Sequence, residues 1–183
     1  MYNLEYLKMQ ISIGFEPEYL TFWGHRPTKN GSIGASCLSQ WFEAKFEYNG
    51  QVYWCMEQFM MAQKARVFGD LEMLDKILNS NSQKEIKNFG RKVKGFNEGT
   101  WQNCREGIVF EGNLQKFSQN PKLKSFLLAT DEKVLVEASP YDTIWGIGMS
   151  ANDERIFEPY SWNGLNLLGF TLMNVRQKIK EDV

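Results

Sequence analysis

Two residues of opposite charge, Glu57 and Lys64, lie seven positions apart in a stretch with the composition of a helix. No Gly or Pro lies between Cys55 and Phe68, and strong helix formers dominate there. Because seven residues make nearly two turns, both side chains are predicted to share one face, about 10 Å apart along the axis. Helical side chains lean toward the N-terminus, so the long Lys64 is expected to reach back toward Glu57. An acid and an amine placed in this way can do acid–base or nucleophilic chemistry.

The helix predicted over Trp54–Asp70 surrounds this pair with an apolar face, made of Met56, Met60, Met61, Ala65, Val67 and Phe68. Desolvation of charged groups on such a face is costly, and groups that bear this cost often do chemistry. The same pattern also fits a structural ion pair beside a methionine-rich core. Both interpretations stay open on the helix alone.

The elements that must position the pair alternate between short strands and helices. Tyr19–Trp23 is predicted as a strand, and Asn49-Gly50 as the turn of a hairpin that leads into Trp54–Asp70. Gly107 or Gly112 is expected to bend a long helix. Further helices are predicted over 71–80, 83–92, 100–119, 121–130 and 162–179, and a further strand over 134–138. With no linker or repeat, one compact, mainly helical α+β domain over residues 18–183 is expected, preceded by a variable lead-in over residues 1–17.

The length and amino-acid composition of the chain agree with a single α+β domain. The chain has 183 residues, 43% hydrophobic and 23% charged, which is typical of a soluble globular domain. A net charge of −1 argues against extensive binding to a nucleic-acid backbone and leaves room for a local basic groove. Aromatic residues reach 14%, with six Trp, which favours stacking surfaces or a tightly packed core.

The cysteines and the single histidine bear on the cellular compartment of the protein and on metal binding. Cys37, Cys55 and Cys104 are odd in number and lack CxxC spacing, so reduced thiols in a cytoplasmic protein are expected. No signal-peptide core opens the chain, and no run approaches the ~20 apolar residues of a membrane span. His25 alone cannot build a multi-histidine zinc site, so neither a metal nor a cofactor is expected.

Three other groups could bind a ligand. Ser39-Gln40-Trp41 can hydrogen-bond and stack, or can begin a strand with a core Trp. Lys87, Arg91 and Lys92 can recognise phosphate, or can form a solvated face. The loop over residues 137–148 offers a carboxylate, a stacking plane and close backbone approach, through Asp142, Trp145, Gly146 and Gly148.

Together these stretches resemble one family, the NADAR or YbiA-like family, from about Phe22 to Ile179. The matching motifs are SQWF, EQFMMAQKA followed by FGD, KNFGRKV, GNLQKF, LVEASPYDTIWGIG and WNGLNLLGFTLMNVR. The resemblance implies a compact α+β fold, mainly helical, and N-glycosidase activity on ribose attached through nitrogen. Many members have Ser or Thr at the start of the helix, followed by Glu-His, whereas this chain reads Cys55, Met56, Glu57, Gln58. Gln58 thus stands where many members have histidine, and glutamine cannot take up a proton as histidine can.

The resemblance also implies roles. Glu57 corresponds to the active-site glutamate, Lys64 to a lysine that forms a Schiff base with the sugar carbon, and Asp142 to the aspartate before the WGxG motif. The resemblance implies that Ser39, Gln40, Trp41, Arg91, Trp145 and Asn166 lie around the substrate. Further contacts with the substrate are predicted for Phe22, Gly24, His25, Lys87, Gly146 and Gly148, although His25 fits an ordinary loop residue equally well. Glu57 and Asp142 would divide proton transfer and stabilisation of positive charge on the sugar. The rival mechanism is direct attack by water, with Lys64 only orienting the substrate.

Among the substrates that the resemblance implies, an ADP-ribosylated guanine is favoured, as a small molecule or within DNA or RNA. The alternative is a phosphorylated intermediate of riboflavin biosynthesis that would release ribose 5-phosphate. A non-catalytic module that binds ADP-ribose or a nucleotide is the alternative of another class, and a metal-dependent hydrolase has poor ligand material here. No membrane association is expected, and the oligomeric state is not predicted.

Overall fold

The computed structural model describes residues 2–28 and 31–182. Their contacts group the chain into two units. Unit 1 comprises Met1–Ser39 and Pro121–Val183, and unit 2 comprises Gln40–Asn120. Glu57 and Lys64 therefore belong to unit 2, and Asp142 belongs to unit 1.

Unit 2 begins with the predicted hairpin. Strand β2 (Glu43–Tyr48) pairs antiparallel with β3 (Gln51–Cys55). Asn49 and Gly50 have φ values of 50° and 77°, as a type I′ two-residue turn requires. Strand β3 continues through Cys55, opposite Glu43, so the helix that we predicted from Trp54 begins at Met56 instead. Trp54 and Cys55 suit a half-buried strand as well as a helix, which is why the sequence pattern placed this boundary wrongly.

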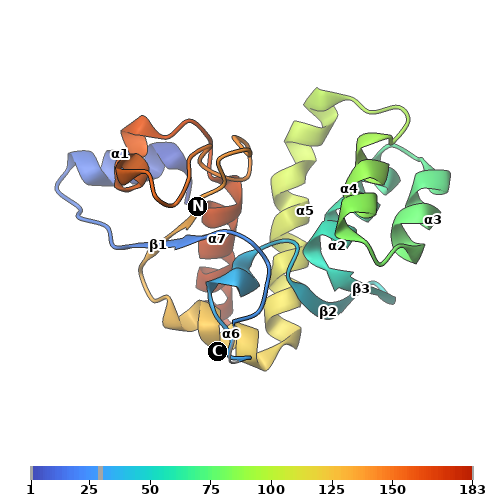
Figure 1. Cartoon of the computed structure of the whole chain (residues 1–183), viewed down its shortest axis with the longest axis horizontal. Helices are drawn as coiled ribbons and strands as arrows, with labels where there is room; N and C mark the ends of the chain where they lie inside the picture. Colours follow the sequence, from blue (N-terminus) through green and yellow to red (C-terminus); the bar gives the residue numbers. More distant parts are fainter. Residues whose placement is uncertain (1, 29–30, 183) are drawn as a thin grey trace. The chain divides into compact units, whose positions relative to one another are not determined.

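Helix α2 (Met56–Val67) is the central element of unit 2. It contacts the three other helices of residues 40–120, which are α3 (Leu71–Asn79), α4 (Gln83–Arg91) and α5 (Glu98–Gln119), as Figure 1 shows. Every residue from 56 to 62 is buried, because neighbours cover the helix on several sides. Val67, which we predicted on the apolar face, is 41% exposed. Asp70 lies outside α2 and caps α3 by accepting a hydrogen bond from the Met73 amide.

Glycines let the helices of unit 2 approach closely. A Cβ added at Gly112 of α5 would lie 2.5 Å from Phe59 Cδ1 and 2.7 Å from Met56 Cε. A Cβ at Gly90 of α4 would collide with Met61. Gly112, one of two glycines expected to bend the helix, therefore lies where α2 packs against α5, and α5 is assigned as one uninterrupted helix.

Unit 1 is built on two parallel strands, β1 (Tyr19–Phe22) and β4 (Val134–Glu137), with Tyr19 beside Val134. Helix α7 (Leu167–Glu181) packs on β4, and a Cβ added at its Gly169 would collide with the Leu135 carbonyl. The remaining elements of unit 1 are α1 (Leu4–Ser12), η1 (Ala35–Leu38), α6 (Pro121–Ala129), η2 (Glu154–Phe157) and η3 (Pro159–Ser161).

Most predicted elements are present, and the mainly helical α+β class is confirmed. The last helix begins at Leu167, five residues later than predicted, because the chain bends at residues 163–164 and the amides of Leu165 and Asn166 bond to the carbonyls of Thr143 and Gly146. The segment predicted as a lead-in contains helix α1; its division from a domain over residues 18–183 stays a prediction. Among the residues that the structure describes, no helix is both long enough and apolar enough to span a membrane.

Candidate active site

Glu57 lies in the first turn of α2, where its side chain is buried and only 3% of the residue is exposed. Its backbone amide donates a hydrogen bond of 2.8 Å to the Gln40 carbonyl, which ties the start of the helix to the preceding segment. The positive end of the helix dipole favours a carboxylate at this position. Glu57 is therefore a sequestered acid that can transfer a proton or stabilise positive charge.

Lys64, two turns along α2, is half-buried between aromatic rings. Its Nζ lies 4.1 Å from the centre of the Phe96 ring and 5.8 Å from that of Trp101. Burial lowers the pKa of Lys64, while the charges of Glu98 and Glu57 act in the opposite direction. An amine with a lowered pKa is neutral, and hence nucleophilic, in a larger fraction of molecules at neutral pH.

Gln58, which stands where the resemblance implies a histidine, uses its side-chain amide for hydrogen bonds to the backbone. Its Oε1 accepts a hydrogen bond of 3.0 Å from the Trp54 amide. Its Nε2 donates to carbonyls at the end of α3, at 3.2 Å to both Ile77 and Leu78. Gln58 therefore connects β3, α2 and α3. The neighbouring Cys55 has no nucleophilic character, because burial raises the pKa of its thiol to about 12.

The SQW triplet lies at the boundary of the units, with Ser39 as the last residue of the first segment of unit 1. Gln40 is buried, and its backbone carbonyl accepts the hydrogen bond from the Glu57 amide. Its side-chain Oε1 accepts no hydrogen bond from the described residues. Trp41 is half-buried, and Lys87 Nζ lies 5.6 Å from the centre of its ring. Arg91 is exposed in the last turn of α4. Unit 2 thus brings Gln40 to Glu57, and Lys87 to Trp41.

The loop of Asp142 is held by its own carboxylate. Asp142 Oδ1 accepts hydrogen bonds from the amides of Ile144 (2.9 Å) and Trp145 (2.8 Å). Gly146 and Gly148 allow the loop to close, because an added Cβ would lie 2.8 Å from the Glu137 carbonyl or 2.9 Å from Thr143 Cγ2, respectively. These glycines serve the packing of the loop itself.

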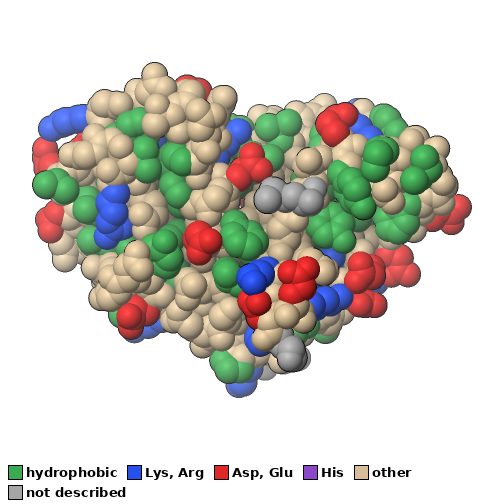
Figure 2. Space-filling view, turned by 180° about the vertical axis from the view of Figure 1, so that it is seen from behind, with side chains coloured by type: hydrophobic (Ala, Val, Ile, Leu, Met, Phe, Trp, Pro, Cys, Tyr) green, Lys and Arg blue, Asp and Glu red, His purple; other side chains and the backbone are tan. Residues whose placement is uncertain are grey.

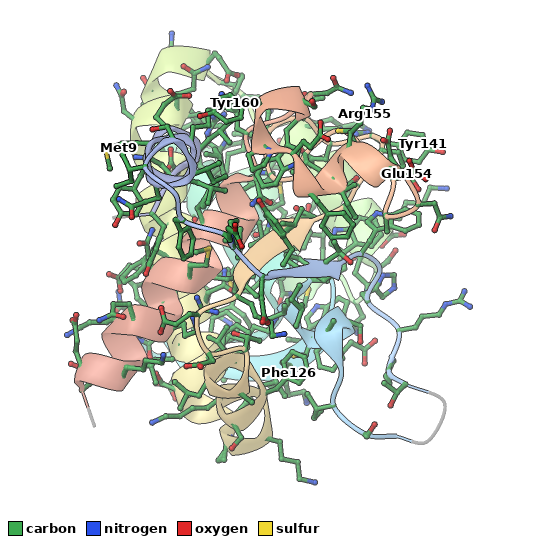
Figure 3. All side chains as sticks on the ribbon, turned by 90° about the vertical axis from the view of Figure 1, so that its left-hand side faces the viewer. Met9, Phe126, Tyr141, Glu154, Arg155 and Tyr160 are labelled. Carbon is green, nitrogen blue, oxygen red and sulfur yellow. The ribbon has the colours of Figure 1, made fainter. Side chains whose placement is uncertain are left out.

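A second aromatic residue marks this loop. Tyr141, beside Asp142, is 88% exposed and projects from unit 1, as Figure 3 shows. Trp145, the predicted stacking plane, is half-buried.

The other predicted contacts of unit 1 differ in accessibility. Asn166 is fully buried, and its side chain accepts from the Glu137 amide and donates to the Leu135 carbonyl, so it fastens β4 to the start of α7. Phe22 is buried at the end of β1, whereas Gly24 is exposed and His25 is half-buried in the loop that follows.

The sequence reasoning did not single out the polar residues on the buried face of α5. Arg105, Asn113 and Lys116 are each less than 9% exposed. Lys116 Nζ lies 5.1 Å from the ring centre of Phe117, and Asn113 Oδ1 accepts no hydrogen bond from the described residues. Their spacing, at the helical period and interleaved with Trp101, Val109 and Phe117, was a usable signal.

Comparisons with known proteins identify the family to which this chain belongs. Residues 21–180 match the family model of the NADAR domain, and the chain belongs to the NADAR family. N-glycosidase R617 of Acanthamoeba polyphaga mimivirus is 45% identical over 159 residues, which are 84% of this chain and 93% of that protein. The prediction of a hydrolase that acts on N-glycosyl compounds is confirmed at this level.

Two further relatives differ in what they support. The NMR structure of Escherichia coli YbiA matches with a TM-score of 0.72 and 22% identity, covering 92% of this chain and 88% of that one, and so shares the fold. The chloroplastic riboflavin biosynthesis protein PYRR of Zea mays is 34% identical over 112 residues, which are 59% of this chain and only 16% of that protein.

Proposed function

We propose that this protein is an N-glycosidase that removes ADP-ribose from ADP-ribosylated guanine. The observation that carries this proposal is the pairing, on one helix, of the buried acid Glu57 with the half-buried amine Lys64, whose pKa is lowered by burial. Cleavage of a bond between ribose and nitrogen needs both a group that attacks or stabilises the sugar carbon and a group that manages protons. The relative named an N-glycosidase supports the reaction class.

In the proposed mechanism, neutral Lys64 Nζ attacks C1 of the ribose. The bond between C1 and the base nitrogen breaks, its electron pair leaves with guanine, and Glu57 passes to the base the proton that Lys64 Nζ gives up on bonding to C1. The sugar ring opens to give an imine on Lys64. Water then adds to the imine carbon, and collapse of this adduct releases ADP-ribose and returns the free amine. We propose Asp142 as the third catalytic residue from its position before the WGIG motif.

The imine is tested by mixing protein with ADP-ribosylated guanine and sodium borohydride and then measuring the intact mass. Reduction fixes the sugar on Lys64, so the expected result is a mass increase equal to ADP-ribose less one oxygen atom, absent from Lys64→Arg. An unchanged mass while guanine is being released contradicts the covalent step and favours direct attack by water. Glu57→Gln, once shown to be folded, is expected to lose ~10²–10⁴-fold in rate.

A riboflavin intermediate is the second candidate substrate, supported by the names of relatives such as the maize protein. Because the chain matches only 16% of that protein's length, this support is confined to one segment of it. Supplying both substrates to the wild-type protein and measuring released base and sugar separates the candidates. Tight ligand binding with no base released from either substrate would instead identify a non-catalytic module.

A further inference from the structure

Arg105 carries a buried charge that the described residues compensate only in part. The residue is 8% exposed, and its Nε donates no hydrogen bond to any described residue. Its ion pair with Glu98 is long, at 3.7 Å from Nη1 to Oε1, and Glu98 is itself 56% exposed. Burial of a guanidinium with so little compensation is costly, and a ligand that carries negative charge would remove that cost.

Arg105 lies close to the proposed nucleophile. It follows Trp101 by one turn of α5, so both side chains share one face of that helix. The Trp101 ring is also the one that lies 5.8 Å from Lys64 Nζ. Glu98 interacts with both cations, with Arg105 in the long ion pair and with Lys64 electrostatically. Lys64 and Arg105 therefore border the same carboxylate.

The packing of α2 on α5 places the part of α5 that carries Arg105 opposite the stretch between Glu57 and Lys64. Gly112 of α5 packs against Met56 near the start of α2, and the Trp101 ring lies beside Lys64 Nζ near the end of α2. The two helices thus run antiparallel, and the α5 residues between 101 and 112 lie opposite α2 residues 57–64. Figure 1 shows α5 alongside α2.

We propose that Arg105 binds the phosphate carried by the ribose of the substrate and makes the protein selective for phosphorylated sugars. This inference rests on the proposed function, since both candidate substrates carry a phosphate on that ribose. A guanidinium offers several donors in one plane and suits the oxygens of a phosphate, which would lie near the sugar carbon that Lys64 attacks. Arg91 and Lys87 are less suited, because Arg91 is exposed and Lys87 packs on Trp41.

The test measures binding without catalysis. Ribose 5-phosphate and ribose are titrated into wild-type protein, Arg105→Gln and Arg105→Lys by calorimetry, with Lys45→Gln, an exposed cation of β2, as the matched control. The wild type is expected to bind ribose 5-phosphate at least tenfold more tightly than ribose. Arg105→Gln is expected to lose about 10–100-fold in affinity for ribose 5-phosphate and none for ribose. Arg105→Lys should lose less, and Lys45→Gln should match the wild type.

Two outcomes overturn the proposal. The first is a wild-type protein that binds ribose and ribose 5-phosphate equally well, which requires no variant to fold. The second is a folded Arg105→Gln protein that retains wild-type affinity for ribose 5-phosphate. Failure of the proposed function is a separate result, namely no release of base by the wild-type protein from either substrate.

Discussion

At the scale of single residues, the environment of Lys64 determines which chemistry it can perform. An exposed lysine is almost fully protonated at neutral pH and cannot attack carbon. In this protein the aromatic rings of Phe96 and Trp101 replace water around the amine, and burial lowers the pKa of Lys64. Glu98 and Glu57 limit this shift, because they stabilise the ammonium form. The balance leaves an amine that can be neutral when a substrate arrives.

This balance predicts the pH dependence of turnover. The second-order rate constant kcat/KM is expected to rise with pH as Lys64 loses its proton and to level off below pH 10.5, the ordinary pKa of lysine. Glu98→Gln removes the charge that most opposes the shift, so its profile should move to lower pH. The measurement is initial-rate kinetics across buffers of constant ionic strength. A profile that does not move in Glu98→Gln would contradict the assignment of the rising limb to Lys64.

The same shift affects stability with a defined sign. Between the folded pKa of Lys64 and 10.5, the unfolded chain binds more protons at this residue than the folded one. The contribution of Lys64 to the free energy of unfolding therefore increases with pH across that window. Protonation at lower pH works against folding, so a catalytic amine in this setting has a cost in stability.

At the scale of elements, the contact between α2 and α5 depends on a glycine. Gly112→Ala is expected to destabilise the protein by about 1–3 kcal/mol, because the new methyl group would meet Phe59 and Met56. Gly107→Ala on the same helix meets no atom within 4 Å and should stabilise by about 0.5–1 kcal/mol, since alanine favours the helix. Urea denaturation of both variants provides the comparison. Equal shifts of the same sign would show that close packing does not govern this contact.

Gln58 is the second element-scale test, because it joins three elements through its amide. Gln58→Leu keeps the volume approximately but removes the acceptor of the Trp54 amide and a donor to the Ile77 and Leu78 carbonyls, so a loss of roughly 2–4 kcal/mol is expected. Gln63→Leu, on the partly exposed side of α2, is the control and should change stability by less than about 0.5 kcal/mol. A Gln58→Leu protein as stable as its control would contradict this structural role.

The elements also show where sequence reasoning succeeds. The Asn49-Gly50 turn, the Ser82 cap and Pro121 at the start of α6 are local signals, and each is present as predicted. The buried side of α5 is different, because periodicity reveals a face without revealing which neighbour covers it. For this reason the sequence analysis does not single out Arg105, although its helix α5 packs on α2, the helix of Glu57 and Lys64.

Side chains that stabilise a loop and side chains that bind a ligand can also look alike in sequence. The resemblance implies that Asp142 and Asn166 act on or contact the substrate, and these roles stay predictions. In the structure Asp142 holds its loop through two backbone amides, and Asn166 holds β4 to α7. Hydrogen bonds of this kind depend on backbone geometry, which includes a left-handed Asn166 with φ of 53°, and that geometry is not encoded in residue spacing.

At the scale of the whole molecule, the surface charge of the protein bears on whether its substrate is a free nucleotide or a nucleotide within a nucleic acid. The net charge is −1, and Figure 2 shows acidic and basic side chains interspersed on one face. Basic residues of unit 2 are partly neutralised, since Lys94 and Lys76 both pair with Glu72. A surface of this composition favours recognition of one nucleotide and its phosphates over extended contact with a strand.

The salt dependence of turnover tests this distinction. For ADP-ribosylated guanine within an oligonucleotide, kcat/KM is expected to fall by less than about tenfold between 50 and 200 mM NaCl, which corresponds to about two phosphate contacts at most. The free ADP-ribosylated nucleotide, measured in parallel, accounts for the effect of salt on the phosphates of ADP-ribose itself. A fall of ~10³-fold confined to the oligonucleotide would require six or more cations along the strand. That result would identify a basic groove and show that the protein recognises long nucleic acids rather than single nucleotides.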